Sequence, residues 1–235
     1  MIKEKVMQDY NLQKDFIEQI SGKKSVEKDS IGVYKYLVYN NFFDVISNSF
    51  PVFYKMVQQN NLEDEFEKSI YEFIQTSAFS AFIWKLSNEY RKFIKSSEFF
   101  NTLEYRDELL LFEYSELYIF MQKKSQKQLE KFSLNKYYRI SNKITLQKYR
   151  YNFLTINLEE KQKTYILGYF DYKLEEVVYR EINVYMYKLL KSLSKTKTLK
   201  ESLKSFMKKN GLSYKKYKEE FAVALAELYR KKVLV

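Results

Sequence analysis

Residues that break helices and form tight turns are scarce in this chain. Its 235 residues include only four glycines and one proline. Because these two residue types usually separate short structural elements, their scarcity favours long helices over a sandwich of many strands. Hydrophobic residues make up 46% of the chain, which is enough to build packed cores. The expected fold is therefore mainly α.

Apolar residues in the first half recur every three or four positions, which is the spacing of one face of a helix. The residue before a proline avoids the helical region, so the chain should break at Phe50 and a new helix should open at Pro51. We predict a helical bundle over residues 1–122. The apolar runs of its helices begin near Leu12, Val33, Val52, Phe66, Phe82 and Leu103.

The pattern changes in the second half. Polar and basic residues dominate the start of residues 123–140, which we interpret as a linker. Three segments rich in β-branched and aromatic residues then predict strands, over residues 146–158, 164–170 and 173–181. We expect a hairpin turn within residues 168–172. Helical spacing returns for three helices, the last two separated by a stop at Asn210-Gly211 and a cap at Ser213. Residues 141–235 therefore predict a small α+β domain of winged-helix-like outline.

Charge is divided unevenly between the halves. Residues 1–122 carry 14 basic and 19 acidic side chains, a net charge of −5, whereas residues 123–235 carry 27 and 11, a net charge of +16. Such an asymmetry indicates two modules with different partners. The basic residues of the second module either form a solvated surface or bind an anionic partner.

The chain contains no histidine and no cysteine. Histidine is the usual general base near neutral pH and a common metal ligand, and cysteine is the readiest nucleophile. Their absence excludes histidine-dependent hydrolysis, thiol catalysis, ordinary zinc sites and disulfides. The sequence also has no glycine-rich phosphate loop. We therefore expect no catalytic residue, metal site or cofactor, and a binding role instead of independent catalysis.

The same absence of cysteine bears on location. Zero cysteine fits a reducing compartment, and no apolar run approaches the roughly 20 residues that span a bilayer. We expect a cytoplasmic protein with no membrane contact.

Lysines of the second half are candidate contacts for an anionic partner. Three helices beside a small sheet favour a winged-helix interpretation, in which a helix enters the major groove of DNA. Arginine reads guanine through paired hydrogen bonds, but only Arg180 and Arg230 follow residue 150, so specific base reading has little support. An alternative use of the sheet is capture of an extended peptide along an edge strand. The candidate contacts for peptide or nucleic acid are Tyr179, Arg180, Lys200, Lys204, Lys208, Lys215 and Lys216.

Several segments resemble, in the same order, one family of bacterial proteins. Leu12–Ile20 has the pattern LQxxFxxxI, Val33–Asn41 reads VYKYLVYNN, and Ser49–Val57 reads SFPVFYKMV. Tyr105–Tyr114, YRDELLLFEY, is similar to an acidic helix of that family, with Glu113 at the glutamate position. In the second half, TYILGYF, VVYREINVYMYKLLKSL and TLKESL resemble its strands and following helix. The family is that of the HvfC-type proteins, which are related to the methanobactin-biosynthesis subunit MbnC and also carry the older description of a DNA-binding-domain family.

This resemblance implies a helical N-terminal domain joined to a small α+β domain. It also implies a non-catalytic partner of a TIM-barrel, multinuclear-iron enzyme that modifies cysteines of a ribosomally made peptide. The iron and its ligands would belong to the enzyme, and this chain would bind the enzyme and hold the peptide leader. The older description implies transcription-related DNA binding instead. We favour the subunit role, because lysine outnumbers arginine and the first half is acidic.

Residues in the matching segments are candidate contacts with the enzyme partner. We expect their aromatic members to lie in a packed core, and the alternative is that they anchor a partner. The candidate partner-binding residues are Tyr34, Tyr39, Asn40, Phe50, Pro51 and Glu113.

Overall fold

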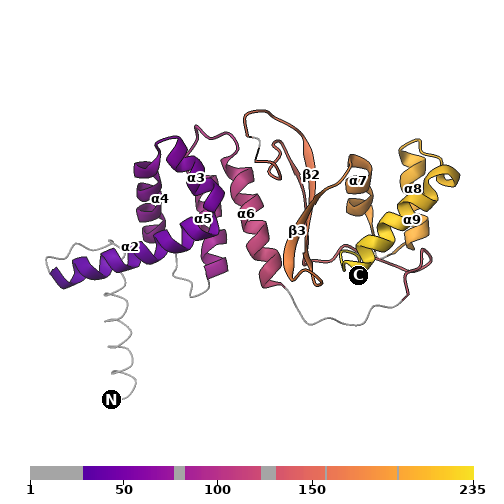
Figure 1. Cartoon of the computed structure of the whole chain (residues 1–235), viewed down its shortest axis with the longest axis horizontal. Coiled ribbons are helices and arrows are strands. Elements are labelled where there is room, and N and C mark those ends of the chain that lie inside the picture. Colours follow the sequence, from indigo (N-terminus) through magenta and orange to yellow (C-terminus); the bar gives the residue numbers. More distant parts are fainter. Residues whose placement is uncertain (1–28, 77–82, 123–130, 157, 195) are drawn as a thin grey trace, which may run out of the picture. The chain divides into compact units, whose positions relative to one another are not determined.

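The computed structural model describes residues 29–76, 83–122, 131–156, 158–194 and 196–235 (Figure 1). The described part contains eight helices and one three-stranded antiparallel sheet. The predicted class, mainly α with a small three-stranded α+β part toward the C-terminus, is therefore confirmed. The predicted helix at Leu12 lies outside the described residues. No described helix combines the length and the apolar character needed to cross a membrane.

The chain divides into two compact units, residues 1–114 and 115–235. The division falls inside helix α6, eight residues before the end of the predicted first domain at residue 122. Helices of the first unit are α2 (Asp29–Ser49), α3 (Pro51–Gln59), α4 (Glu63–Thr76), α5 (Ile83–Ser96) and the start of α6 (Arg106–Met121). Helix α3 opens at Pro51, as the sequence predicts. Helix α2 ends at Ser49, which agrees with the break expected at Phe50 before the proline.

Aromatic rings fill the core of the first unit. Phe66 on α4 is 1% exposed and lies at the centre of this cluster. Five rings have their centroids within 6.5 Å of its own: Phe43, Phe53, Tyr54, Tyr90 and Phe100. The hydroxyl of the fully buried Tyr90 is 2.7 Å from that of Ser69, so the ring enters the core without leaving its polar atom unpaired. The aromatic residues of the first half thus serve mainly to pack its helices.

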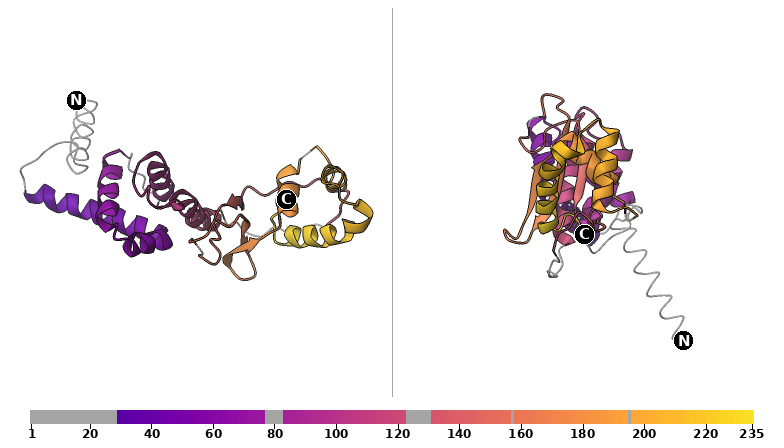
Figure 2. Two further views of the ribbon diagram at one scale, coloured as in Figure 1. Left: turned by 90° about the horizontal axis from the view of Figure 1, so that it is seen from above. Right: turned by 90° about the vertical axis from the view of Figure 1, so that its right-hand side faces the viewer.

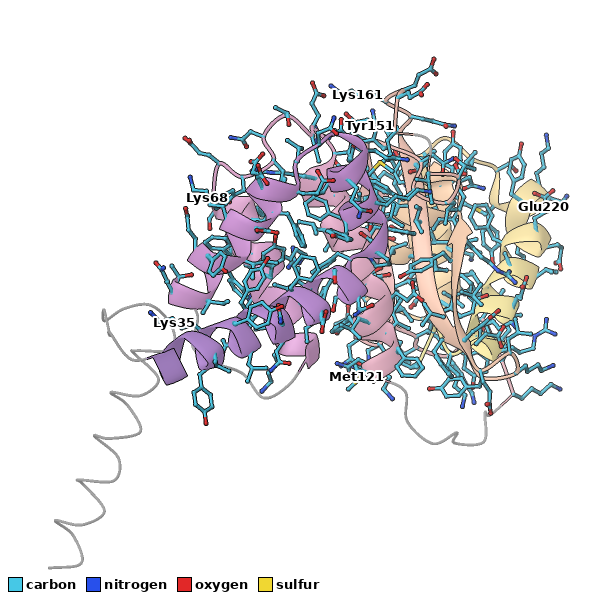
Figure 3. All side chains as sticks on the ribbon, turned by 60° about the vertical axis from the view of Figure 1, so that its left-hand side comes forward. Lys35, Lys68, Met121, Tyr151, Lys161 and Glu220 are labelled. Atoms are coloured by element: carbon cyan, nitrogen blue, oxygen red, sulfur yellow. The ribbon has the colours of Figure 1, made fainter. Side chains whose placement is uncertain are left out.

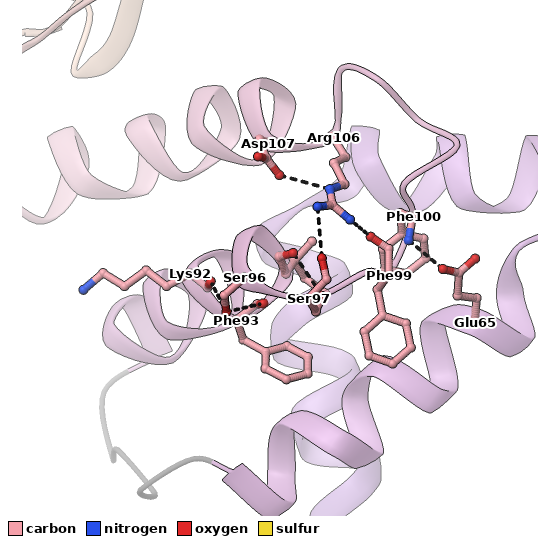
Figure 4. A network of polar contacts seen from close by, with 10 residues as sticks. Glu65, Lys92, Phe93, Ser96, Ser97, Phe99, Phe100, Arg106 and Asp107 are labelled. Carbon is pink, nitrogen blue, oxygen red and sulfur yellow. Dashed lines mark hydrogen bonds and ion pairs between the residues drawn. The ribbon is translucent and has the colours of Figure 1, made fainter.

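A polar network holds the loop between α5 and α6 (Figure 4). The guanidinium of Arg106 donates to the carbonyls of Ser97 and Phe99 and pairs with Asp107. The carboxylate of Glu65 accepts a hydrogen bond from the backbone N–H of Phe100 at 2.6 Å. These bonds satisfy backbone groups that the helix ends leave unpaired, so a loop without regular structure stays closed over the core.

The second unit contains a meander of three strands followed by three helices. Its elements are β1 (Thr145–Tyr149), β2 (Thr164–Asp171), β3 (Glu176–Glu181), α7 (Val184–Ser192), α8 (Leu199–Lys209) and α9 (Tyr214–Arg230). The strands are antiparallel in the order β1-β2-β3. Figures 1 and 2 show the three helices, orange to yellow, together on one side of the sheet. Leu167 and Tyr169 of β2 pack there against Leu203, Met207 and the other apolar side chains of these helices.

Residues 131–140 of the predicted linker are part of the second unit. Tyr138 is 5% exposed and belongs to the core cluster of this unit. The backbone N–H of Arg139 donates to the carbonyl of Val235 at 2.9 Å, and that of Ser141 donates to the carbonyl of Val233 at 2.8 Å. Residues 123–130 lie outside the described part. The pairing with the last residues of the chain is non-local, so the sequence pattern did not predict it.

The strands differ from the predicted ones in two places. The first was expected over residues 146–158, but β1 ends at Tyr149. The amide oxygen of Asn152 accepts from the backbone N–H of Leu154 at 3.1 Å, a local turn that competes with strand pairing. Gly168, expected in the hairpin turn, lies inside β2 instead. The turn comes later, where Glu175 adopts a φ of 58°.

Side chains of the second unit closely surround the backbone of Gly168. A Cβ at this position would lie 2.6 Å from Cε1 of Tyr179, 2.7 Å from Oγ1 of Thr145 and 2.9 Å from Cδ1 of Ile119. Glycine within a strand often marks such a close approach. We predict that Gly168→Ala lowers the free energy of unfolding by about 1–3 kcal/mol, the usual cost of overpacking.

Chemical denaturation of the full chain measures this effect. Gly32→Ala is the matched control, because a Cβ at Gly32 meets nothing within 4 Å. If both variants unfold at the same denaturant concentration as the parent, the crowding around Gly168 is not a constraint on the fold.

Candidate anion-binding cleft

Helices α7 and α8 of the second unit enclose a cleft of about 600 Å³. Four lysines line it: Lys188 and Lys191 from α7, Lys197 from the connecting loop and Lys209 from the last turn of α8. Three serines, at 192, 202 and 205, and Asn210 add polar groups, and the rings of Tyr187 and Phe206 add apolar surface. Concave sites with apolar walls and a few polar groups are the usual form of ligand sites.

The local sequence explains how the two helices present these side chains. On α8, positions 202, 205, 206 and 209 follow the three-to-four-residue spacing of one helix face. Both helices are capped at their N-termini. The amide oxygen of Asn183 accepts from the backbone N–H of Met186 at 2.8 Å, which caps α7. Thr198 and Glu201 form a capping box at the start of α8.

Among the residues that the structure describes, no carboxylate lines the cleft. The nearest acidic side chain on α8, Glu201, accepts hydrogen bonds from the backbone N–H and the hydroxyl of Thr198, both at 2.8 Å. These bonds, first from the backbone and then from the hydroxyl, lower the pKa of Glu201, so it stays ionised as part of the helix cap. No described carboxylate forms an ion pair with any of the four lysines. The cleft therefore presents a concentrated positive charge to solvent.

The basic residues singled out from the sequence lie outside this cleft. Lys200, Lys204 and Lys208 are exposed on a different face of α8, with the Lys204 ammonium 5.4 Å from the centroid of the Tyr214 ring. Lys215 and Lys216 are exposed in the first turn of α9. The predicted lysines thus fall into two surface groups, and neither group lines the cleft between α7 and α8.

The other two residues of that predicted set have partners within the unit. The Arg180 guanidinium donates to the Glu227 carboxylate at 2.7 Å, and this hydrogen bond raises the pKa of Arg180. The hydroxyl of Tyr179 is 2.7 Å from that of Ser115. Both side chains therefore help to hold elements of the second unit against the sheet.

The predicted partner-binding residues of the first unit also separate into two groups. Tyr34 and Pro51 are exposed and Asn40 is half-buried. Phe50 is fully buried, and Tyr39 is 9% exposed and stacks on Tyr71 with 4.5 Å between ring centroids. The buried rings belong to the core of the unit, the first of the two interpretations that the sequence left open.

Glu113 caps helix α3 from a distant part of the chain. Its two carboxylate oxygens accept hydrogen bonds from the backbone N–H groups of Val52, at 2.7 Å, and Phe53, at 3.0 Å. Phe50, at the N-cap position, has no side-chain acceptor to offer, and Pro51 has no N–H to satisfy. A buried carboxylate at the positive end of a helix is favoured by both the hydrogen bonds and the helix dipole. Glu113 is therefore a structural residue of the corner between α2 and α3.

The candidate contacts chosen from the sequence do not include the four lysines of the cleft. They are spread over two helices and the loop between them, so no single segment displays them as a cluster. A helical-wheel comparison of α8 was the available signal, because it places position 209 with 202 and 205 and apart from 200, 204 and 208. Their meeting with Lys188 and Lys191 depends on how α7 packs on α8.

No protein-family model matches this chain, and no curated protein matches it significantly.

Proposed function

We propose that this chain is a non-catalytic accessory subunit whose second unit binds an acidic segment of a peptide for a separate enzyme. The observation that carries the proposal is the cleft between α7 and α8, whose described lining contains four lysines and no carboxylate. A solvent-exposed cleft lined by positive charge attracts and orients a negatively charged segment. The second unit supplies the peptide site, and the first unit supplies a surface for the enzyme.

The resemblance to the HvfC-type proteins supplies the kind of partner. It supports a TIM-barrel iron enzyme as the catalyst and the leader of a ribosomally made peptide as the ligand. The absence of histidine and cysteine from the sequence agrees with a division of labour in which metal and thiol chemistry lie on the partners.

The exposed face of α9 favours a peptide over duplex DNA. In a winged-helix protein the second helix of the helix-turn-helix enters the major groove. On α9 the exposed positions that follow Lys215 and Lys216 are Glu219, Glu220, Val223 and, in the last turn, Arg230, and Glu220 lies on the solvent side of the helix in Figure 3. Two carboxylates on that face would meet the phosphates of the DNA backbone, which repel them.

DNA binding is the second candidate, because one connection in the second unit has the required form. Helices α8 and α9 are joined by four residues, Asn210 to Ser213, with Gly211 at a φ of 67°. A short turn that contains glycine is typical of helix-turn-helix units. The lysines in the first turn of α9 would then contact phosphates.

Titration with an acidic peptide tests the peptide-binding role. The probe is a short labelled peptide of glutamate, aspartate and glycine with one central phenylalanine, and its control has glutamine and asparagine in place of the acids. We predict saturable binding of the acidic probe by the full chain, which weakens steeply when salt rises from about 50 mM to about 200 mM. Equal affinity for the neutral control, or no binding of either peptide, would contradict the proposal. Tighter binding of duplex DNA than of the acidic probe would favour the second candidate.

Co-purification tests the subunit role separately. We predict that the full chain co-purifies with a TIM-barrel iron enzyme encoded beside it, and that the peptide substrate strengthens the complex. If the two proteins stay separate even with the peptide present, the subunit role fails, whatever the outcome of the peptide titration.

A further inference from the structure

We infer that the α7–α8 cleft is a specific recognition site for one apolar side chain flanked by carboxylates. The lysines on the outer face of α8 lie outside this site and contribute only to long-range attraction. This inference rests on the proposed function, because it names the site and the sequence chemistry of the peptide that the second unit binds.

The size and lining of the cleft support an apolar side chain at its centre. A volume of about 600 Å³ lies within the range of sites that enclose small ligands. Phe206 is 6% exposed and packs against Phe221 with 6.2 Å between ring centroids, so its ring is held firmly by the core. Tyr187 adds a second, half-buried ring from α7. An aromatic or aliphatic side chain of the peptide would bury apolar area mainly against the half-buried ring of Tyr187, because Phe206 has little exposed surface left.

The position of the lysines supports carboxylates on both sides of that side chain. Lys188 and Lys191 lie one turn apart on α7, whereas Lys197 lies in the loop before α8 and Lys209 in the last turn of that helix. Lysine acts as a point charge on a flexible stem and does not form the planar, paired hydrogen bonds of arginine. The site therefore suits several separate acidic side chains better than one rigid, planar anion.

Hydroxyl groups in the cleft suit a peptide backbone. The side chain of Ser205 is exposed and forms no hydrogen bond with any described residue. Ser192 donates to the carbonyl of Leu189 at 2.7 Å and keeps its lone pairs as acceptors. Together they offer a donor and an acceptor to the amide groups beside the central side chain.

Two double variants with the same change of charge distinguish the contribution of the cleft lysines to peptide binding from that of the lysines on the outer face of α8. Lys191→Glu/Lys209→Glu alters the cleft, and Lys200→Glu/Lys208→Glu alters the outer face of the same helix. At about 150 mM salt, we predict a loss of affinity for the acidic probe of about thirtyfold in the first variant and about threefold or less in the second. Equal losses, or a larger loss in the outer variant, would overturn the inference. If the parent chain does not bind the probe at all, the proposed function fails and not this inference alone.

A second pair of variants tests the apolar part of the site without a change of charge. Ser205→Trp places a bulky side chain at an exposed position of the cleft, and Val223→Trp places one on α9, where the parent side chain is 66% exposed. We predict that Ser205→Trp binds the probe at least tenfold more weakly than the parent, and that Val223→Trp binds it with the affinity of the parent. A similar tenfold loss is expected for the parent chain when serine replaces the phenylalanine of the probe. Circular dichroism and thermal melting establish that both variants are folded. Parent-like binding by a folded Ser205→Trp variant would overturn the inference.

Discussion

Replacing Glu113 by alanine should lower the free energy of unfolding by about 2–4 kcal/mol. The change removes the acceptors of two backbone N–H groups at the start of α3, those of Val52 and Phe53. The N–H of Phe53 is buried in the core of the first unit, so water cannot readily replace the lost carboxylate. The effect is larger than that of an ordinary exposed helix cap because both bonds are charge-assisted.

Hydrogen exchange of the Val52 and Phe53 amides in the full chain locates the effect. We expect both amides to exchange faster in Glu113→Ala, and Glu113→Gln to lie between this variant and the parent, because its single carbonyl oxygen still accepts. Glu116→Ala is the control, since Glu116 is exposed on the same helix. If Glu113→Ala and Glu116→Ala have equal stability, Glu113 does not cap α3 in solution, and its role as a partner contact is open again.

Replacing Phe66 by alanine should have the largest effect on the first unit, a loss of about 3–5 kcal/mol. Phe66 is 1% exposed and makes ring contacts with five other aromatic residues. Truncation leaves a cavity between rings that are too large and too rigid to close it. The cost therefore includes lost burial, lost ring contacts and the cavity itself.

Denaturant unfolding of the full chain, followed by circular dichroism, measures this loss. Tyr71→Ala is a suitable control, because Tyr71 lies on the same helix α4 but is 50% exposed. We expect the control to cost about 1 kcal/mol or less, mainly through its stacking on Tyr39. Equal losses in the two variants would mean that the aromatic cluster is not the centre of the core.

Local patterns in the sequence predicted the elements whose causes are local. The opening of α3 at Pro51 follows from the restricted backbone of the residue before a proline. The end of α8 at Asn210-Gly211 and the cap of α9 by Ser213, whose hydroxyl accepts from the Lys216 N–H at 3.4 Å, follow from the preferences of those residue types. In each case the neighbours in the sequence are also the neighbours in space.

Features with distant causes were not predictable in the same way. The capping of α3 by Glu113 joins residues 60 and 61 positions apart, and Gly168 is confined by side chains from β1, β3 and α6. The cleft has the same character, since its lysines come from two helices and a loop. The sequence showed that the second half is basic. Only the packing of α7 on α8 shows which lysines converge and which point elsewhere.

Chemical-shift mapping on the isotope-labelled full chain tests directly whether the acidic peptide binds in the cleft between α7 and α8. The acidic probe with its central phenylalanine is added stepwise, and the backbone amide signals are followed. We predict that the largest shifts occur at Lys188, Lys191, Ser205 and Lys209, which line the cleft. Largest shifts at Lys200, Lys204 and Lys208, or in the first turn of α9, would place the acidic peptide elsewhere on the second unit and contradict its binding in the cleft.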